Sequence, residues 1–170
     1  VISVGNMESA NLITLAYVGK FCLEPPIIGI GVHPKRHSYP ILESRNEFVV
    51  NLPSEDQSYI VDYCGTRSGK NINKWEQLNL TKTPSQKIKT PLIEEFPWNI
   101  ECKIVNKVTL GSHTCFFGEV VMIHAELKTI RDNKVDPKKK AQLAYINGKY
   151  LPLEKKIIAN QGFSLRNQKM

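Results

Sequence analysis

Two polar clusters at the ends of apolar segments carry side chains of the types that can bind an anion. Residues 33–41 place four polar side chains at the start of an expected helix: Arg36, His37, Ser38 and Tyr39. Residues 64–75 combine glycines with four donor side chains: Arg67, Ser68, Lys70 and Lys74. A helix start offers free N–H groups and a positive dipole end, glycine lets the backbone approach closely, and Arg adds a charged fork of donors. Both clusters therefore predict an anion site.

A further polar cluster lies in residues 10–21, where Asn11 and Thr14 precede an apolar run that ends at Gly19 and Lys20. Each cluster alone is also typical of a capped helix or a basic surface turn. Neighbouring apolar segments add four rings: Tyr17, Phe21, Phe116 and Phe117. The clusters and rings together predict a phosphorylated ligand with a flat apolar part, held in the mouth of a barrel.

Other catalytic and metal-binding patterns do not occur in the sequence. There is no Gly-x-Ser-x-Gly elbow, no His-Glu-x-x-His, no Walker loop and no Gly-x-Gly-x-x-Gly after a strand. The four histidines are far apart and have no Cys or carboxylate at ligand spacing, so we expect no bound metal. The four cysteines are scattered singly, which favours reduced thiols over two disulfides.

Composition indicates one domain over residues 1–170, of which 41% are hydrophobic. The chain begins at Val1 without an initiating Met, so we expect the native N-terminal segment to be truncated. Its apolar runs are too short to cross a bilayer, and we expect a soluble, cytoplasmic protein that does not bind membranes. The net charge of +7 is mixed with acids and has few stacking aromatics nearby, which predicts a solvated surface that does not bind nucleic acid.

Strand signals dominate the chain. Short β-branched or aromatic segments, separated by turn residues, occupy residues 1–4, 25–32, 46–52, 100–110 and 114–127. Helices are expected over 38–46 with Ser38 as cap, over 54–65 with Ser54 as cap and Gly65 as stop, and over 136–146. We expect a mainly β fold, an antiparallel barrel with a few peripheral helices, since a barrel removes exposed strand edges.

The order of these segments resembles the flavin reductase-like family, whose members fold as an FMN-binding split β-barrel, and within it the flavoredoxin-like branch. The matching segments follow the family's order and cover nearly the whole chain: residues 11–32, 34–53, 64–80, 111–121 and 143–153. The resemblance implies FMN bound in a groove between the two protomers of a homodimer. The apolar strands "FVVNL" and "CFFGEVV" would supply surface for that dimer.

The resemblance also implies which residues bind the cofactor. Main-chain N–H groups of one stretch would contact the isoalloxazine ring: Thr14, Ala16, Tyr17, Val18, Gly19 and Lys20. Two polar segments would lie near the ribityl phosphate: Arg36, His37, Ser38 and Tyr39, and the basic loop residues Ser68, Lys70 and Lys74. Asn51 and Leu52 would close a strand end against the cofactor, and Asn11 is a further cofactor-binding candidate.

The segment "GSHT" interrupts an apolar stretch with Gly111, Ser112 and His113. In the family, the matching His lies near the open side of the flavin, where an imidazole can face an incoming nicotinamide or another substrate. The alternative is that His113 merely satisfies the backbone at a strand bend. The resemblance favours His113 as the catalytic residue.

We expect an FMN-dependent oxidoreductase that takes hydride or electrons from NAD(P)H or a protein donor and passes them to an acceptor, which could be a redox partner protein. Two other hypotheses remain open at this point. One is a flavoredoxin-type electron-transfer protein without NAD(P)H reductase turnover. The other is a basic, colourless nucleic-acid-binding barrel whose affinity collapses with salt.

Overall fold

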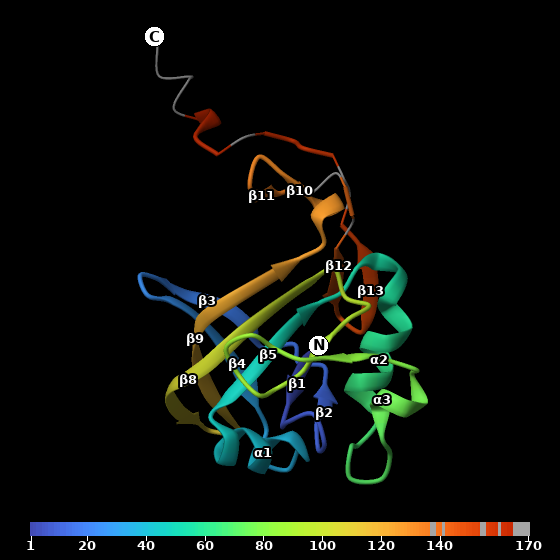
Figure 1. The fold of residues 1–170 in the computed structure, drawn as a ribbon. Helices are drawn as coiled ribbons and strands as arrows, with labels where there is room; N and C mark the ends of the chain where they lie inside the picture. The colour runs from blue at the N-terminus through green and yellow to red at the C-terminus, as the bar shows by residue number, and fades with distance from the viewer. Residues whose placement is uncertain (137–138, 141, 154–155, 160, 165–170) are drawn as a thin grey trace.

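A computed structural model describes residues 1–136, 139–140, 142–153, 156–159 and 161–164. Its main feature is a seven-stranded antiparallel sheet in the order β2-β1-β5-β8-β9-β4-β3 (Figure 1). The strands are β1 (Ile2–Val4), β2 (Asn11–Ile13), β3 (Val18–Leu23), β4 (Pro26–Val32), β5 (Glu47–Leu52), β8 (Trp98–Leu110) and β9 (His113–Ala125). All five segments predicted as strands are strands in the structure, so the mainly β prediction is confirmed.

The centre of the sheet is a long hairpin of β8 and β9, each 13 residues long. A two-residue turn, Gly111 and Ser112, joins them where Leu110 pairs with His113. Gly111 has φ +52, which glycine adopts readily at the first position of a tight hairpin turn. The break in the apolar pattern is therefore a chain reversal between two strands.

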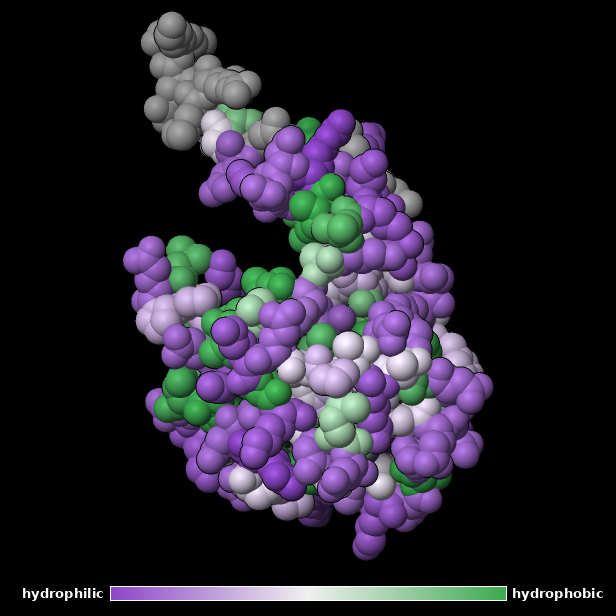
Figure 2. All heavy atoms as spheres, viewed as in Figure 1, coloured by the Kyte–Doolittle hydropathy of each residue, from purple (hydrophilic) through white to green (hydrophobic). Residues whose placement is uncertain are grey.

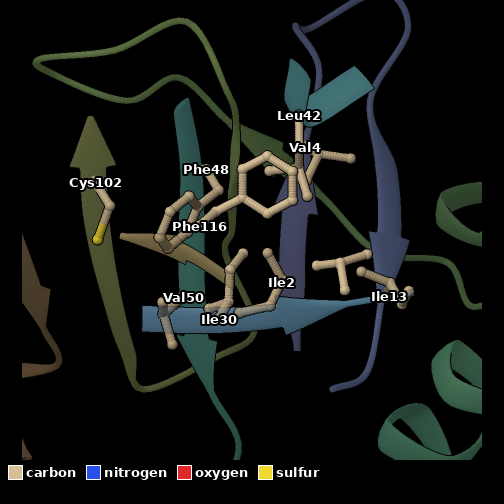
Figure 3. Packing of buried hydrophobic residues seen from close by; sticks show 10 residues of the cluster. Ile2, Val4, Ile13, Ile30, Leu42, Phe48, Val50, Cys102 and Phe116 are labelled. Atoms are coloured by element: carbon tan, nitrogen blue, oxygen red, sulfur yellow. The ribbon is translucent and has the colours of Figure 1, made fainter. Parts of the chain in front are cut away.

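The sheet curls around the largest of three apolar clusters, the split-barrel arrangement expected from the sequence. Figure 3 shows side chains from several strands pointing toward one another, among them Ile2 of β1, Phe48 of β5 and Phe116 of β9. These three side chains are at most 1% exposed. Gly118 lets the sheet close over Phe48, because a Cβ there would lie 2.7 Å from the Phe48 ring. Leu42 from a helix completes this core.

Short helices lie outside the sheet: α1 (Ser38–Arg45), α2 (Ser58–Thr66) and α3 (Lys74–Gln77), with the 3-10 turns η1 (Glu55–Gln57) and η2 (Leu127–Thr129). The cap of α1 is His37, one residue before the predicted Ser38, because the Ser38 hydroxyl bonds elsewhere. Ser54 precedes η1 as predicted, and its N–H donates to Gln57 Oε1 at 2.9 Å. α2 continues through Gly65 and ends at Thr66.

Three two-stranded hairpins complete the described part: β6 (Lys82–Thr83) with β7 (Leu92–Ile93), β10 (Ile130–Arg131) with β11 (Lys134–Val135), and β12 (Leu143–Ile146) with β13 (Lys149–Pro152). The helix predicted over 136–146 is wrong for residues 143–146, and residues 137, 138 and 141 of that prediction lie outside the described part. Asn147 and Gly148 have φ 48 and φ 79, the pair of positive angles that a two-residue hairpin turn requires. This local turn signal outweighs the helical pattern.

The four cysteines are free, as expected: Cys22 is exposed, Cys115 is half-buried, and Cys64 and Cys102 are buried. Burial raises the pKa of Cys64 to about 11 and that of Cys102 to about 12. Both thiols are thus held neutral and act as apolar packing groups. None of the helices described is long and apolar enough to span a membrane.

Candidate functional site

The polar clusters found in the sequence meet in one small cavity of about 110 Å³. We call it the basic seat and define it by eight of its lining residues: Asn11, Arg36, His37, Ser38, Arg67, Ser68, Gly69 and Lys74. They come from β2, from the start of α1, from the loop after α2 and from the start of α3. Segments far apart in the chain therefore combine into one cationic hollow of a size that accepts a phosphate group.

A buried hydrogen bond fixes the shape of the basic seat. Asn11 Nδ2 donates to Ser38 Oγ at 2.8 Å, and the two residues are 8% and 1% exposed. Gly69 lies directly against this pair, since a Cβ at position 69 would be 2.0 Å from Asn11 Oδ1. Any side chain at residue 69 would displace Asn11 and break its link between β2 and α1. The basic seat therefore requires a glycine at position 69.

Lys74 has a different role from the expected phosphate donor. Its side chain is buried, and Nζ donates to the carbonyl oxygens of Leu12 and Cys64, both at 2.7 Å. Burial, and to a smaller extent the nearby charge of Arg36, lower the pKa of the Lys74 ammonium. The ammonium joins β2 to the last turn of α2 and gives the seat a fixed positive charge. Lys70 is exposed and lines a neighbouring hollow of about 400 Å³ instead of the seat.

A larger groove of about 400 Å³ adjoins the basic seat, and Gly65 and Thr66 line both. We call it the apolar groove; its walls include Leu15, Ala16, Val18, Val50, Leu52, Val61, Tyr145 and Tyr150. Thr14 supports one wall by donating from Oγ1 to the carbonyl of Val61 at 2.6 Å. A single molecule with an anionic end and a flat apolar end could occupy both hollows.

The segment between β2 and β3 offers the groove main-chain donors. Within the described part, the N–H groups of Leu15 and Ala16 make no hydrogen bond. Hydrogen-bond acceptors on the edge of a ligand ring need donors at fixed positions. Backbone amides supply such donors whatever the side chains are. The residues present therefore fit a flavin: a cationic seat for its phosphate, an apolar groove for its ring and free amides beside that groove.

His113 lies at the other side of this segment, in an aromatic cluster. Its ring meets Tyr17 edge-on at a centroid distance of 5.1 Å and His33 at 5.3 Å. Ser112 Oγ lies 2.8 Å from His113 Nδ1. None of these residues lines the apolar groove, whereas Ala16 and Val18, which flank Tyr17, do. His113 thus contacts Tyr17, whose chain neighbours line the groove, and does not itself line it.

Several other predicted residues lie away from both hollows. Gly19 and Lys20 are on the outer part of β3, where they pair with Gly29 and Ile28. Tyr39 points toward Thr114, whose Oγ1 is 3.2 Å from the Tyr39 hydroxyl. Of the four rings that sequence analysis associated with the ligand, none lines the groove: Tyr17, Phe21, Phe116 and Phe117.

Asn51 is a structural residue of the core. It is fully buried, its Nδ2 donates to Ser3 Oγ at 3.0 Å, and its Oδ1 accepts the N–H of Ile93 at 3.1 Å. The nitrogen and the oxygen of the Asn51 side-chain amide thus both form hydrogen bonds within the protein. Leu52, the next residue, does line the groove as expected.

Sequence reasoning missed one part of the wall of the apolar groove. Asp62, Tyr145 and Tyr150 form part of it, and Tyr150 donates its hydroxyl proton to Asp62 Oδ1 at 3.1 Å. Burial and this hydrogen bond raise the pKa of Tyr150 to about 12. The misassigned helix over 136–146 concealed the wall, and the Asn-Gly turn at 147–148 was the signal that could have revealed it.

Comparison with known proteins places this geometry in context. The family model described as "Flavin reductase like domain" matches residues 1–154. An uncharacterized protein of Archaeoglobus fulgidus is 34% identical over 134 residues, which are 78% of this chain and 75% of that protein. The structure is similar to a flavoredoxin of Desulfovibrio vulgaris, with a TM-score of 0.85 and 25% identity, covering 96% of this chain and 89% of that one.

The fold is also shared with an FMN-binding protein of Thermus thermophilus whose structure holds 1-cyclohex-2-enone. The TM-score is 0.81 at 21% identity, and the similarity covers 94% of this chain and 88% of that one. At this identity the similarity concerns the fold alone. The split-barrel fold expected from the sequence is thus confirmed by solved structures as well as by the strand order.

Proposed function

The chain belongs to the family of flavin reductase-like domains, and from this premise we propose that it is an FMN-dependent oxidoreductase. The observation that carries the proposal is the continuity of the two hollows: the basic seat and the apolar groove share Gly65 and Thr66. A phosphate in the seat and a flat ring in the groove would be joined by a short polar chain passing these two residues. FMN has these three parts.

The chain's own residues would bind and orient this cofactor. Arg36 and Arg67 are exposed at the seat, where both could donate to a phosphate, and the Arg67 guanidinium lies over the Tyr63 ring at 5.7 Å. The buried Asn11–Ser38 pair and Lys74 keep the seat open. Leu15 and Ala16 would donate their N–H groups to the ring edge. When bound, FMN supplies the redox chemistry, accepting hydride from NAD(P)H or electrons from a protein donor and passing them to an acceptor.

A homodimer is the assembly we propose, with a corrected choice of surface. The strand "FVVNL" cannot supply the interface, because Phe48, Val49 and Val50 are at most 3% exposed. Exposed apolar side chains gather instead on β3 and the outer end of β8, at the left in Figure 2: Phe21, Leu23, Val105, Val108 and Leu110. Patches of this kind mark protein contacts.

Binding measurements with two flavins test the proposal. In the Arg36→Ala/Arg67→Ala double variant, FMN should bind roughly 100-fold more weakly or worse, since two charged hydrogen bonds of about 1.5–3 kcal/mol each are lost. Riboflavin has no phosphate, so its affinity should be the same in variant and wild type. Arg45→Ala, an exposed arginine at the end of α1, is the matched control and should leave both affinities unchanged. Equal FMN titrations in the double variant and the control would reject the seat.

The similarity to flavoredoxins supports a second candidate, an FMN electron carrier that does not turn over NAD(P)H. Stopped-flow mixing of the FMN-loaded protein with NADH or NADPH separates the two functions. Rapid bleaching of the flavin band by either nucleotide supports the oxidoreductase. A flavin that ignores both nucleotides and is reduced only by a protein donor supports the carrier.

A further inference from the structure

A further polar hollow, of about 260 Å³, lies where the start of β8 and the residues before it meet the end of β9, remote in sequence from the basic seat. We call it the acidic cavity, and its charged and polar lining consists of Glu94, Glu95, Asn99, His124, Glu126 and Lys140. The lining thus has three carboxylates and one ammonium, in a chain whose net charge is +7. Glu94 Oε2 accepts the Thr83 hydroxyl at 3.2 Å and Glu95 Oε1 accepts the Thr81 N–H at 2.9 Å, so one oxygen of each is already bonded. Phe96, Pro97 and Ala125 supply an apolar part of the wall. Neither the flavin site nor the resemblance accounts for this hollow.

Two buried oxygens in the acidic cavity have no hydrogen-bond partner among the described residues: Asn99 Oδ1 and Glu126 Oε2. Asn99 is 6% exposed and lines the cavity; its Nδ2 donates to the carbonyl of Phe96 at 3.2 Å, and its oxygen has no partner among the described residues. The other carboxylate oxygen of Glu126 pairs with Lys128 Nζ. A buried acceptor left unpaired costs about 1–3 kcal/mol, so two in one hollow call for donors from outside the chain.

Both acceptors are held by rigid structure. Asn99 is in β8, paired with His124 of β9. The main chain of Glu126 is fixed on both sides, because its N–H donates to Pro97 O at 2.8 Å and its carbonyl accepts the N–H of Thr129 at 2.8 Å. Behind the cavity, His124 Nε2 lies 2.6 Å from Glu101 Oε1, so the His124 ring is held in place. The acceptors are therefore preorganised for a ligand.

The chemistry of the lining identifies the ligand class. Both buried polar atoms of this lining that lack a partner among the described residues are acceptors, and the Lys140 ammonium is the cation beside them. The described residues contain no group of three or more His, Cys, Asp or Glu side chains that could hold a metal ion. A ligand that satisfies the two acceptors must carry N–H donors and positive charge. The cavity has room for several water volumes of about 30 Å³ each, which is enough for a short aliphatic amine.

We propose that the acidic cavity is a binding site for a small organic cation with a primary ammonium group. The ammonium donates to Asn99 Oδ1 and Glu126 Oε2, its charge is balanced by the surrounding carboxylates, and its carbon chain lies against Phe96 and Pro97. The site is independent of the flavin: it shares no lining residue with the basic seat or the apolar groove.

Calorimetric titration with putrescine, and with the neutral isostere 1,4-butanediol, tests this inference on the full chain with and without saturating FMN. We expect saturable binding of putrescine alone, the same in both FMN states. Asn99→Leu and Glu126→Gln should each weaken it roughly tenfold or more, since the first removes a hydrogen-bond acceptor and the second removes the negative charge that pairs with the ammonium. Lys140→Met should tighten it, because it removes a like charge from the lining.

The control is Glu24→Gln, which changes the net charge equally at the exposed turn before β4 and should leave putrescine binding unchanged. Glu126 is partly exposed, so Glu126→Gln should fold even if Asn99→Leu does not. Absence of saturable binding, equal binding of butanediol, or equal weakening by Glu24→Gln would each overturn the proposal and leave a water-filled hollow. Because FMN affinity is measured separately, failure here is distinguishable from failure of the proposed function.

Discussion

The basic seat and the acidic cavity differ in how their buried polar groups are satisfied. In the seat, the buried side chains are already bonded within the protein: Asn11 to Ser38, and Lys74 to two carbonyl oxygens. In the cavity, Asn99 Oδ1 and Glu126 Oε2 have no partner in the described part of the chain. The seat is thus complete before an anion arrives, and its ligand meets exposed arginines. The cavity becomes complete only when a donor enters it.

The largest effect is expected from Lys74, on which the structure of the seat depends. Lys74→Met leaves the buried carbonyls of Leu12 and Cys64 without their donor, which should lower the free energy of unfolding by about 2–4 kcal/mol. Urea denaturation measures the change. Lys70→Met, which removes the same charge from an exposed position, should stay within about 0.5 kcal/mol of wild type. If both variants unfold alike, the seat does not depend on its internal bonds.

The corresponding buried charge near the acidic cavity is Glu101. Burial of this carboxylate opposes its charge, but hydrogen bonds from the Gln86 N–H, from His124 and from the Lys87 N–H together lower its pKa below the usual 4.5. The pKa of Glu101 is lower in the folded protein than in the unfolded chain. The ionised Glu101 therefore stabilises the fold fully at pH values above its unfolded-state pKa, and this contribution is lost as the pH falls through its folded-state pKa.

Glu101→Gln should therefore lower the free energy of unfolding at pH 7 by about 1–3 kcal/mol and flatten its decline below about pH 4.5. Denaturation curves recorded from pH 7 to pH 3 give both quantities. Glu119→Gln on the neighbouring strand is the control, since no hydrogen bond of its side chain occurs in the described part. If the free energy of unfolding of Glu101→Gln falls with pH as steeply as that of wild type, Glu101 is not the source of the pH dependence.

A smaller effect is expected when the geometry of the seat is changed and its charge is kept. Gly69→Ala must push the Asn11 side chain away from Ser38, since the new Cβ would lie 2.0 Å from Asn11 Oδ1. We expect FMN affinity to fall about tenfold and the free energy of unfolding by about 1 kcal/mol, the value of one lost hydrogen bond. Fluorescence titration and a thermal melt measure these. Wild-type FMN affinity in this variant would mean that the Asn11–Ser38 bond does not shape the seat.

The smallest effect is expected at His113, which belongs to neither hollow. His113→Ala should keep FMN affinity and slow flavin reduction about two- to tenfold, because loss of its contact with Tyr17, worth about 0.5–1.5 kcal/mol, loosens the segment beside the groove. A single-turnover reduction trace and a thermal melt on one preparation distinguish the roles. Earlier melting with a wild-type reduction rate would make His113 a purely structural residue of the hairpin.

The strands and most of the seat could be predicted from the sequence because their signals are local. The apolar segments of β4, β5, β8 and β9 are bounded by turn residues, and the seat residues cluster next to glycines or at a helix start. Such patterns reflect backbone preferences and need no knowledge of tertiary contacts.

The orientation of single side chains could not be predicted in this way. From the sequence, Lys74 is indistinguishable from the other basic residues of its loop. Its ammonium is buried because α3 packs against β2, which only the structure shows. Asn51 reads as a polar strand end, yet tertiary contacts with Ser3 and Ile93 place it in the core. The acidic cavity corresponds to no sequence motif, because its lining combines residues 94–97, 99, 124–126 and 140, which are separated in the chain.

The two-residue turn at Gly111 and Ser112 also bears on how the chain finds this fold. Joining Leu110 to His113 closes a minimal loop, whereas joining Ile2 to Val50 closes one that contains most of the first third of the chain. Loop-closure entropy grows with length, so the central hairpin is the least costly part of the sheet to assemble. We expect the sheet to grow outward from β8 and β9, with their amides protected first in pulsed hydrogen exchange and those of β1 later.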